Sequence, residues 1–222
     1  MCGRYSQTLD VSKLIERFKV KPPPFKLSPR YNIAPSQDAP VIVNLEEHSL
    51  KMFRWGLIPS WAKDPSIGQK MINARLETLQ EKPSFKRLIR KKRCLVISDG
   101  FYEWKKESNG KTKTPMRVFL KSREPFAFAG LWDTWKNAEG IETHSFTIIT
   151  TEAIASIKTI HERMPVILDP KIEESWLDPE LEPSQVLASL TPFPTPEKME
   201  FYPVSKLINS PKNDLPECID QA

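Results

Sequence analysis

Apolar and polar positions alternate in short runs through the middle of this chain, and the runs are separated by turn residues. This period of two predicts β-strands, because successive side chains of a strand point to opposite faces. A polar segment at residues 45–49 predicts a turn between the first two of them. The predicted strands cover residues 39–44, 50–58, 93–98, 100–106, 115–121, 126–132, 145–151 and 201–205.

Five other segments repeat their apolar residues at spacings of three and four, which predicts helices. Asp10 is a candidate helix cap for the first, and the prolines at 22–24 predict its end. The helices interrupt the strands irregularly, so a doubly wound parallel sheet is not expected. We expect one α+β domain over residues 1–222, with a curved, largely antiparallel β-sheet or barrel-like core and peripheral helices. The predicted helices cover residues 10–20, 84–92, 153–161, 171–177 and 184–190.

Composition supports a soluble globular protein. Of the 222 residues, 39% are hydrophobic and 27% are charged, and no run approaches the roughly 20 apolar residues of a membrane helix. Charged residues interrupt the first twenty positions, which argues against a secretory signal. We therefore expect a cytoplasmic monomer that does not bind membranes.

Positive charge is concentrated in one segment. Residues 82–93 carry seven lysines and arginines and no carboxylate, within a chain of net charge +5, whereas residues 169–182 are mostly acidic. A solvated helix face and a phosphate-binding track both remain open for the basic run.

The sequence offers no signature of a cofactor or a metal. Only 7 glycines are present, and none forms a phosphate-binding loop. The cysteines Cys2, Cys94 and Cys218 do not have metal-ligand spacing, and no cluster of histidine, cysteine and carboxylate stands out. We expect neither a cofactor nor a metal ion.

Cys2 is the suggestive cysteine, because removal of Met1 would leave an amine and a thiol on adjacent carbons. Their ordinary pKa values, about 7.7–8.0 and about 8.5, make both groups available as nucleophiles near neutral pH. The amine could activate the thiol toward an amide, or both groups could add to one aldehyde carbon. The second route closes a five-membered thiazolidine.

Eight segments occur in an order that resembles the SOS response-associated peptidase (SRAP) family of abasic-site processing proteins. They are "MCGRY", "YNIAPSQ", "RWGLIPSWAKD", "NARLET", "RCLVISDGFYEWKK", "FAGLWD", "ITTEA" and "IHERMP", and the resemblance runs from residue 2 to about residue 205. It implies covalent capture of abasic sites in single-stranded DNA through a thiazolidine with the N-terminal cysteine.

The resemblance assigns four candidate catalytic residues, Cys2, Asn73, Glu103 and His161. Cys2 is the nucleophile, and the Asn73 amide can orient its amine. Glu103 shares a strand face with Phe101, so partial burial would suit its carboxyl group to proton exchange. His161 can give or take a proton at the sugar. Considered singly, Asn73 could instead be a turn residue, Glu103 an edge-strand residue and His161 a helix cap.

Other residues are candidates for holding the DNA. Two arginines and two threonines could bind the phosphates beside the lesion, while a proline and a tryptophan could pack on bases. The predicted DNA-binding residues are Arg4, Arg75, Pro35, Trp61, Thr150 and Thr151.

Three functions follow from these patterns. We expect an abasic-site crosslinking protein, with an associated lyase activity through the Schiff base. The alternatives are an N-terminal-nucleophile peptidase or amidase, which includes removal of its own Met1, and a noncovalent single-stranded DNA-binding module. A hydrolase would need an oxyanion hole, whereas aldehyde capture needs the aminothiol and a phosphate-binding groove.

Overall fold

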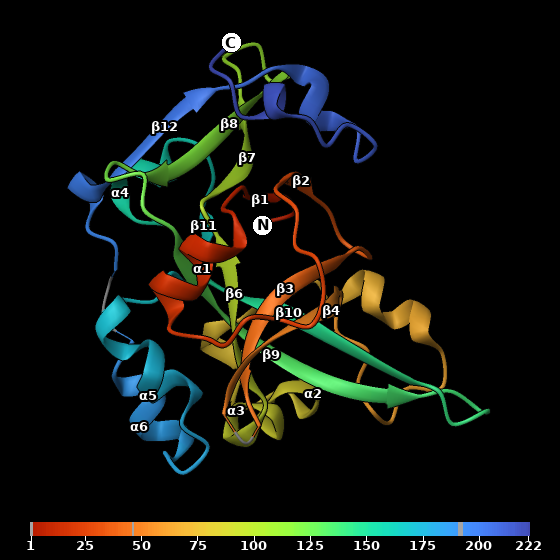
Figure 1. The fold of residues 1–222 in the computed structure, drawn as a ribbon. Coiled ribbons are helices and arrows are strands. Elements are labelled where there is room, and N and C mark those ends of the chain that lie inside the picture. Colours follow the sequence, from red (N-terminus) through yellow and green to blue (C-terminus); the bar gives the residue numbers. More distant parts are fainter. Residues whose placement is uncertain (1, 46, 191–192) are drawn as a thin grey trace.

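A computed structural model describes residues 2–45, 47–190 and 193–222. Its strands form two sheets that pack on each other, with short helices around them (Figure 1). The strands are β1 (Tyr5–Gln7), β2 (Arg30–Ile33), β3 (Asp38–Asn44), β4 (His48–Trp55), β5 (Asn73–Arg75), β6 (Arg93–Ser98), β7 (Gly100–Lys106), β8 (Lys113–Leu120), β9 (Phe126–Lys136), β10 (Glu142–Glu152), β11 (Arg163–Pro165) and β12 (Met199–Pro203).

The first sheet closes on itself as a barrel. Its strands follow the order β10-β4-β3-β6-β9, and β9 pairs again with β10. Most of these pairings are antiparallel, but β10 runs parallel to β4 and to β5. The short strands β5 and β11 extend the barrel along β10.

The second sheet has the order β12-β8-β7-β1-β2. Its strand β1, between β7 and β2, is only three residues long, and Tyr5 pairs with Phe101 on one side and with Ile33 on the other. The chain passes from the barrel strand β6 to β7 of this sheet through the single residue Asp99. The two sheets are therefore joined rigidly beside the N-terminal strand.

Both faces of the barrel strands are buried, which explains near-continuous apolar runs such as residues 94–97. Alternate residues of β6 belong to two different clusters: Cys94 and Val96 pack inside the barrel, and Leu95 and Ile97 pack against the surrounding helices. The inner cluster also contains Tyr5 and Phe101 of the second sheet, so one core spans both sheets.

The α-helices are short; all but α4 pack against the outer face of the barrel, whereas Ile157 of α4 belongs to the inner cluster (Figure 1). They are α1 (Val11–Phe18), α2 (Pro83–Lys86), α3 (Leu88–Lys91), α4 (Ala155–Lys158), α5 (Glu173–Leu177) and α6 (Pro183–Ala188). The 3-10 helices are η1 (Pro65–Lys70), η2 (Leu76–Thr78), η3 (Pro170–Ile172), η4 (Pro196–Lys198), η5 (Lys206–Asn209) and η6 (Pro216–Cys218).

Asp10 caps α1 as predicted, since its side chain accepts a hydrogen bond from the Lys13 amide. The prediction that the prolines end this helix is wrong. The helix ends at Phe18, and Lys19 takes a left-handed conformation with φ 51°, which stops the helical hydrogen bonds before Pro22 is reached.

Two further predictions of local structure need correction. The segment 84–92 forms two four-residue helices that meet at Arg87, so that Phe85, Leu88 and Ile89 can all be buried. His48, expected in a turn, is the first residue of β4 and pairs with Asn44. The predicted turn at 45–49 includes residue 46, which lies outside the described residues.

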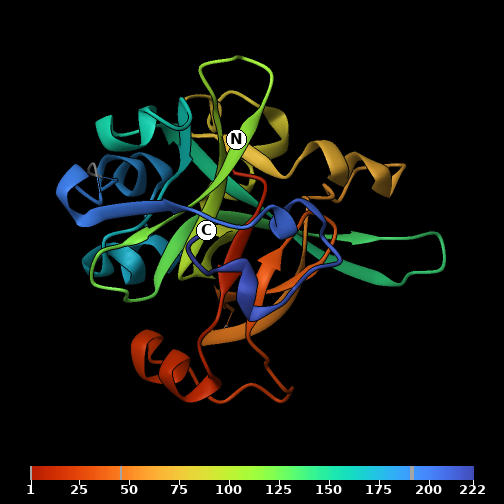
Figure 2. The ribbon, with the colours of Figure 1, turned by 90° about the horizontal axis from the view of Figure 1, so that it is seen from above.

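The fold class is confirmed as α+β with a barrel-like, largely antiparallel core. The strands β9 and β10 continue beyond the barrel as a hairpin that extends away from the rest of the molecule (Figure 2). None of the described helices is long and apolar enough to cross a membrane.

Candidate active site

Cys2 lies in the core between the two sheets and is fully buried. The Asn73 side chain, at the start of β5 on the barrel, donates a hydrogen bond from Nδ2 to the Cys2 carbonyl oxygen over 2.8 Å. The Cys2 thiol contacts the Arg4 carbonyl oxygen at 3.8 Å. The sequence element at residue 2 and the motif at residue 73 therefore meet, as expected.

Glu103 reaches the same region from β7. Phe101 and Glu103 share the inner face of the second sheet, and their exposed fractions are 0% and 3%. Burial raises the pKa of the Glu103 carboxyl group above its ordinary value. Burial also raises the pKa of the Cys2 thiol, and the nearby Glu103 charge adds to that effect. The site thus holds two acids that both resist ionisation.

His161 follows α4, and its Nδ1 atom accepts a hydrogen bond of 3.0 Å from the Arg163 amide. Nδ1 also lies 3.2 Å from the Arg163 carbonyl oxygen. In the neutral tautomer that accepts from the amide, the ring proton is on Nε2, which is then a donor. His161 is close enough to Glu103 for its positive charge to lower the pKa of that carboxyl group, against the larger effect of burial. Cys2, Asn73, Glu103 and His161 therefore form one group.

Sequence reasoning missed Arg163, which supports this group from β11. Its guanidinium donates to both carboxylate oxygens of Glu77, over 2.7 and 3.0 Å, and to the Thr150 carbonyl oxygen over 2.7 Å. Through its amide it also fixes the His161 ring. The sequence did offer one signal for Arg163. It lies two residues after His161, and in an extended segment residues two apart point to the same face.

Arg75 lies beside the site with its side chain exposed. It is two residues from Asn73 on β5 and therefore on the same face, and it pairs with Thr150 of β10. Among the described residues its guanidinium has no hydrogen bond or ion pair. It is available to an external anion.

Arg4 is differently placed. Its guanidinium donates to the Asn32 side chain over 2.7 Å and to the carbonyl oxygens of Ile208 and Asn209 over 2.6 and 3.1 Å. These contacts connect the N-terminal segment to η5 near the other end of the chain. A phosphate contact by Arg4 stays a prediction, and it would have to use the remaining N–H groups or displace these acceptors.

The two threonines of β10 do not share a face. Thr150 is fully buried on the side of Ile148, and its hydroxyl oxygen lies 3.3 Å from an Arg163 guanidinium nitrogen. Thr151 points to the other side and lines a separate cavity of about 170 Å³ with Leu76 and Phe193. The two hydroxyls therefore point to opposite sides of β10, and phosphate binding by Thr150 and Thr151 stays a prediction.

Pro35 and Trp61 occupy loops. Pro35 is half-buried in a turn whose next residue, Ser36, has φ 70°. Trp61 is 57% exposed and borders a cavity of about 240 Å³ with Lys63 and Lys70. Its ring is free to stack on a base.

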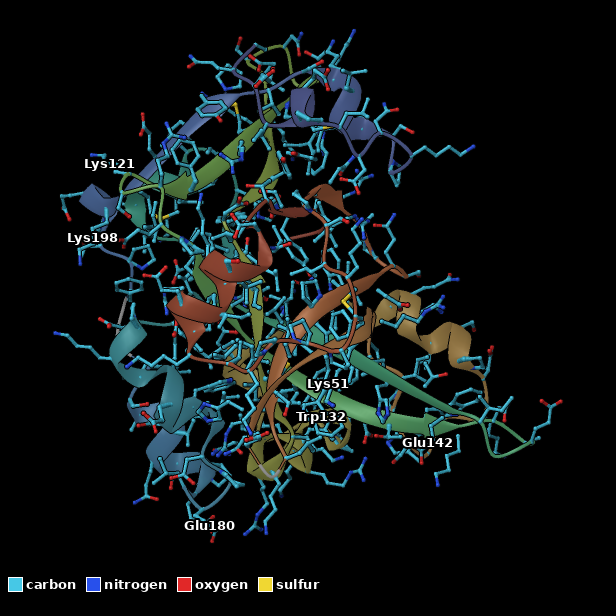
Figure 3. The ribbon with its side chains drawn as sticks, viewed as in Figure 1. Lys51, Lys121, Trp132, Glu142, Glu180 and Lys198 are labelled. Atoms are coloured by element: carbon cyan, nitrogen blue, oxygen red, sulfur yellow. The ribbon has the colours of Figure 1, made fainter. Side chains whose placement is uncertain are left out.

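The basic run at residues 82–93 lies at the far end of β6 from β1. Much of its charge is used within the molecule: Arg93 is buried, Arg87 pairs with Asp133 over 2.5 Å, and Lys92 lies 3.7 Å from the centre of the Trp132 ring. Figure 3 shows Trp132 in the lower half of the molecule, away from the labelled Lys121 and Lys198 beside the second sheet.

A cavity of about 540 Å³ lies elsewhere, between the end of β8 and η3, and its lining includes Lys121, Phe126 and Asp169. It contains neither a cysteine nor a histidine. We assign the chemistry to the Cys2 region, because shifted pKa values and nucleophiles meet there. Among the described residues no group of histidine, cysteine and carboxylate side chains is arranged to hold a metal ion.

Known proteins resemble this chain over nearly its whole length. The SOS response associated peptidase (SRAP) family pattern matches residues 1–211. Abasic site processing protein YoqW of Bacillus subtilis (strain 168) is 47% identical over 99% of both chains. Abasic site processing protein HMCES of Xenopus tropicalis is 33% identical over 87% of this chain and 66% of that protein.

Solved structures give the same result. The crystal structure of a protein from Bacteroides thetaiotaomicron has a TM-score of 0.89 and 32% identity, with all of both chains covered. A second, from Bordetella bronchiseptica, has a TM-score of 0.72 and 31% identity over 92% of this chain and 95% of that one. The match of sequence motifs, overall fold and family pattern means that this chain belongs to the SOS response-associated peptidase family.

Proposed function

We propose that this protein processes abasic sites in DNA by capturing them covalently through the amine and thiol of Cys2. The observation that carries the proposal is the convergence of Asn73, Glu103 and His161 on the buried Cys2. The names of the relatives YoqW and HMCES support the substrate class. The proposed chemistry requires that Met1 is removed.

The capture proceeds in two bond-forming steps. The Cys2 amine adds to the aldehyde carbon of the ring-opened deoxyribose, and loss of one water molecule leaves an imine. The Cys2 sulfur then adds to the carbon of the protonated imine, whose nitrogen keeps its proton, and the thiol proton passes to the Glu103 carboxylate. The product is a thiazolidine. Because burial keeps the thiol protonated, the amine is the first nucleophile in this scheme.

The neighbouring side chains have complementary roles. Asn73 fixes the Cys2 carbonyl group and thereby the direction of the amine. Glu103, whose pKa is raised by burial, can donate a proton to the departing water and later accept the thiol proton. When protonated on both nitrogens, His161 can donate from Nδ1 to the Arg163 carbonyl oxygen at 3.2 Å and give its Nε2 proton to the sugar ring oxygen, which opens the ring.

Two exposed side chains favour a single-stranded substrate. Arg75 is exposed and can bind a phosphate, and the exposed Trp61 ring can stack on a splayed base, which duplex DNA does not present. Pro35 can add an apolar contact, and Thr150 can act through Arg163. In this proposal Arg4 binds a second DNA phosphate.

The imine would also permit β-elimination of the DNA 3′ phosphate, which would make lyase activity a side reaction of capture. A peptidase or amidase that uses the same thiol remains the rival. The raised thiol pKa argues against it, since an amidase needs the thiolate as its first nucleophile. A noncovalent DNA-binding module would leave the buried Glu103 unexplained.

The test uses purified protein whose free Cys2 terminus is verified by mass spectrometry. It is mixed with a single-stranded oligonucleotide that contains one abasic site, and a heat- and detergent-resistant adduct is measured on a denaturing gel. We expect an adduct whose mass equals the sum of the two partners minus one water. No adduct with a verified free Cys2 would refute the proposal.

Three controls identify the nucleophile. Cys2→Ala should abolish the adduct, whereas Cys218→Ala, at another buried cysteine, should retain it. Capping the aldehyde with methoxyamine should also prevent it. An adduct that survives Cys2→Ala and capping would assign the reaction to another group, and hydrolysis of peptides without any adduct would favour the amidase.

A further inference from the structure

Asp99 occupies the single position between the last residue of β6 and the first residue of β7. Because β6 belongs to the barrel and β7 to the second sheet, Asp99 sits where the two sheets are joined. The site lies between the same two sheets, with Asn73 on the barrel side and Glu103 on the other. A group held by Asp99 is thus fixed relative to both.

The Asp99 carboxylate holds the N-terminal strand. One oxygen accepts a hydrogen bond of 2.5 Å from the Ser6 hydroxyl, and the other accepts from the Thr8 amide over 3.1 Å and from the Thr8 hydroxyl. The Asp99 amide and the Ser98 hydroxyl both donate to the Ser6 carbonyl oxygen, over 3.1 and 3.2 Å. Residues 98–99 therefore enclose Ser6.

Arg117 completes this arrangement from β8. Its guanidinium lies 3.4 Å from an Asp99 carboxylate oxygen, and the two side chains are only 7% and 10% exposed. It also lies flat against Gly100, where an added Cβ would come within 3.0 Å of the Arg117 Nε and Nη2 atoms. A side chain at position 100 would force the Arg117 guanidinium to shift, so the glycine after Asp99 favours this close approach.

The strand β1 needs such a constraint. It has three residues, and its pairing with β2 is irregular between Tyr5 and Gln7. A slip of one position would move Tyr5 out of the core and place Ser6 there. Cys2 is four residues from Ser6, a distance of at most about 14 Å along the chain. A shift of register at Ser6 would therefore also displace Cys2.

We propose that Asp99 is a positioning residue for the N-terminal aminothiol, which holds Ser6 and Thr8 at the junction of the sheets and thereby sets where Cys2 lies relative to Asn73 and Glu103. This rests on the proposed function of Cys2. Asp99 does not touch the reacting atoms. Its contribution is to the geometry of capture.

The test compares Asp99→Asn with Glu173→Gln in the full chain. Glu173 forms a similarly buried, two-contact ion pair with Arg17 between α5 and α1, over 2.7 and 2.9 Å, and serves as a matched control for destabilisation. Each protein is titrated with abasic single-stranded DNA, and the first-order rate of adduct formation at saturation is separated from the DNA concentration that gives half of that rate. Thermal unfolding of each variant is recorded in parallel.

We expect Asp99→Asn to lower the saturating rate by about 10- to 100-fold, since misplacement of reacting groups by about 1 Å costs that much, and to change the half-saturating DNA concentration less than about twofold. Glu173→Gln should lower the melting temperature comparably and keep the rate. Thr8→Val, which removes one donor to Asp99, should lower the rate less, and Thr8→Ser should restore it. An unchanged rate in Asp99→Asn, or equal losses in both ion-pair variants, would overturn the proposal.

Alkylation of the cysteines by iodoacetamide, followed by peptide mass spectrometry, tests without DNA whether Asp99 holds the N-terminal strand in place. In Asp99→Asn the buried Cys2 should react at least about threefold faster, while Cys94 and Cys218 stay protected. Equal acceleration at all three cysteines, or none at Cys2, would contradict the proposal. If the wild-type protein forms no adduct with abasic DNA, the proposed function fails, and this alkylation pattern still decides whether Asp99 holds the N-terminus.

Discussion

The N-terminal site and the basic run lie at opposite ends of β6. They differ in whether their charged side chains make contacts within the fold. The basic run has the highest density of cations in the sequence, yet Arg87, Arg90, Lys92 and Arg93 are engaged in contacts within the fold. At the site the acid Glu103 is buried, and the exposed cation Arg75 has no partner among the described residues.

This difference between the basic run and the site shows that charge density along a sequence does not locate a functional site. Arg93 donates to the carbonyl oxygens of Trp176, Ile89 and Arg90, so its cation serves to close the ends of neighbouring helices. Glu103 is placed where burial raises the pKa of its carboxyl group, which costs stability but favours the protonated form that can act as a proton donor. Four substitutions test this contrast, from the largest expected effect to the smallest.

Glu103→Gln should have the largest effect on capture. Loss of the acid and base is expected to slow adduct formation about 10²- to 10³-fold. The fold should not suffer: a raised pKa in the folded state means that wild-type stability falls as pH rises from the unfolded value of about 4.3 through the folded pKa. The glutamine variant should therefore gain stability relative to wild type across that window in urea unfolding. A parallel pH dependence of both proteins would contradict the role of burial.

Arg93→Met should show the reverse pattern. Several buried carbonyl groups would lose their donor, and we expect a loss of about 3 kcal/mol in the free energy of unfolding. Urea unfolding measures this loss. Adduct formation by the protein that remains folded at low temperature should be close to that of wild type, and a specific loss of capture there would place Arg93 in the DNA-binding surface.

Trp61→Ala should weaken binding of single-stranded DNA by about 1–2 kcal/mol, because the exposed indole would no longer stack on a base. Fluorescence anisotropy with a labelled oligonucleotide measures the effect. Trp61→Phe should recover most of the affinity. Ile141→Ala, at another exposed apolar side chain with 60% exposure, is the matched control and should change nothing. Equal losses at the two positions would argue for a nonspecific surface effect.

Arg75→Ala is expected to weaken DNA binding about 3- to 10-fold and to reduce the slope of log affinity against log salt by about one, as for the loss of one phosphate contact. The comparison variant removes two exposed cations of the basic run, Lys86 and Lys91, together. It should change affinity less than about twofold. If the double variant loses more than Arg75→Ala, the DNA path includes the basic run and the contrast fails.

Much of the architecture could be read from local patterns. Short apolar runs bounded by turn residues located the barrel strands β3, β6, β9 and β10, and Asp10 marked the start of α1. The pairing of residues 101 and 103 on one face correctly predicted that Glu103 is shielded from water. These features depend on neighbours within a few positions, so the sequence alone carries them.

Other features depend on parts of the chain that meet only in the fold. The end of α1 at Lys19 and the split of residues 84–92 into α2 and α3 follow packing, which overrides local propensity. Closure of the barrel through β9 and β10 needs pairings that no single segment specifies.

The sequence by itself determined which groups can react: a cysteine behind the initiator methionine, an amide, a carboxyl group and an imidazole in ordered motifs. Only the tertiary structure decided how they are used. It buries Cys2 and Glu103 together, occupies Arg4 with the Asn32 side chain and the Ile208 carbonyl oxygen, and uses Asp99 to hold the N-terminal strand. The physical reason is that residue type fixes what a group can do, whereas pKa, available donors and geometry depend on distant residues brought near by folding.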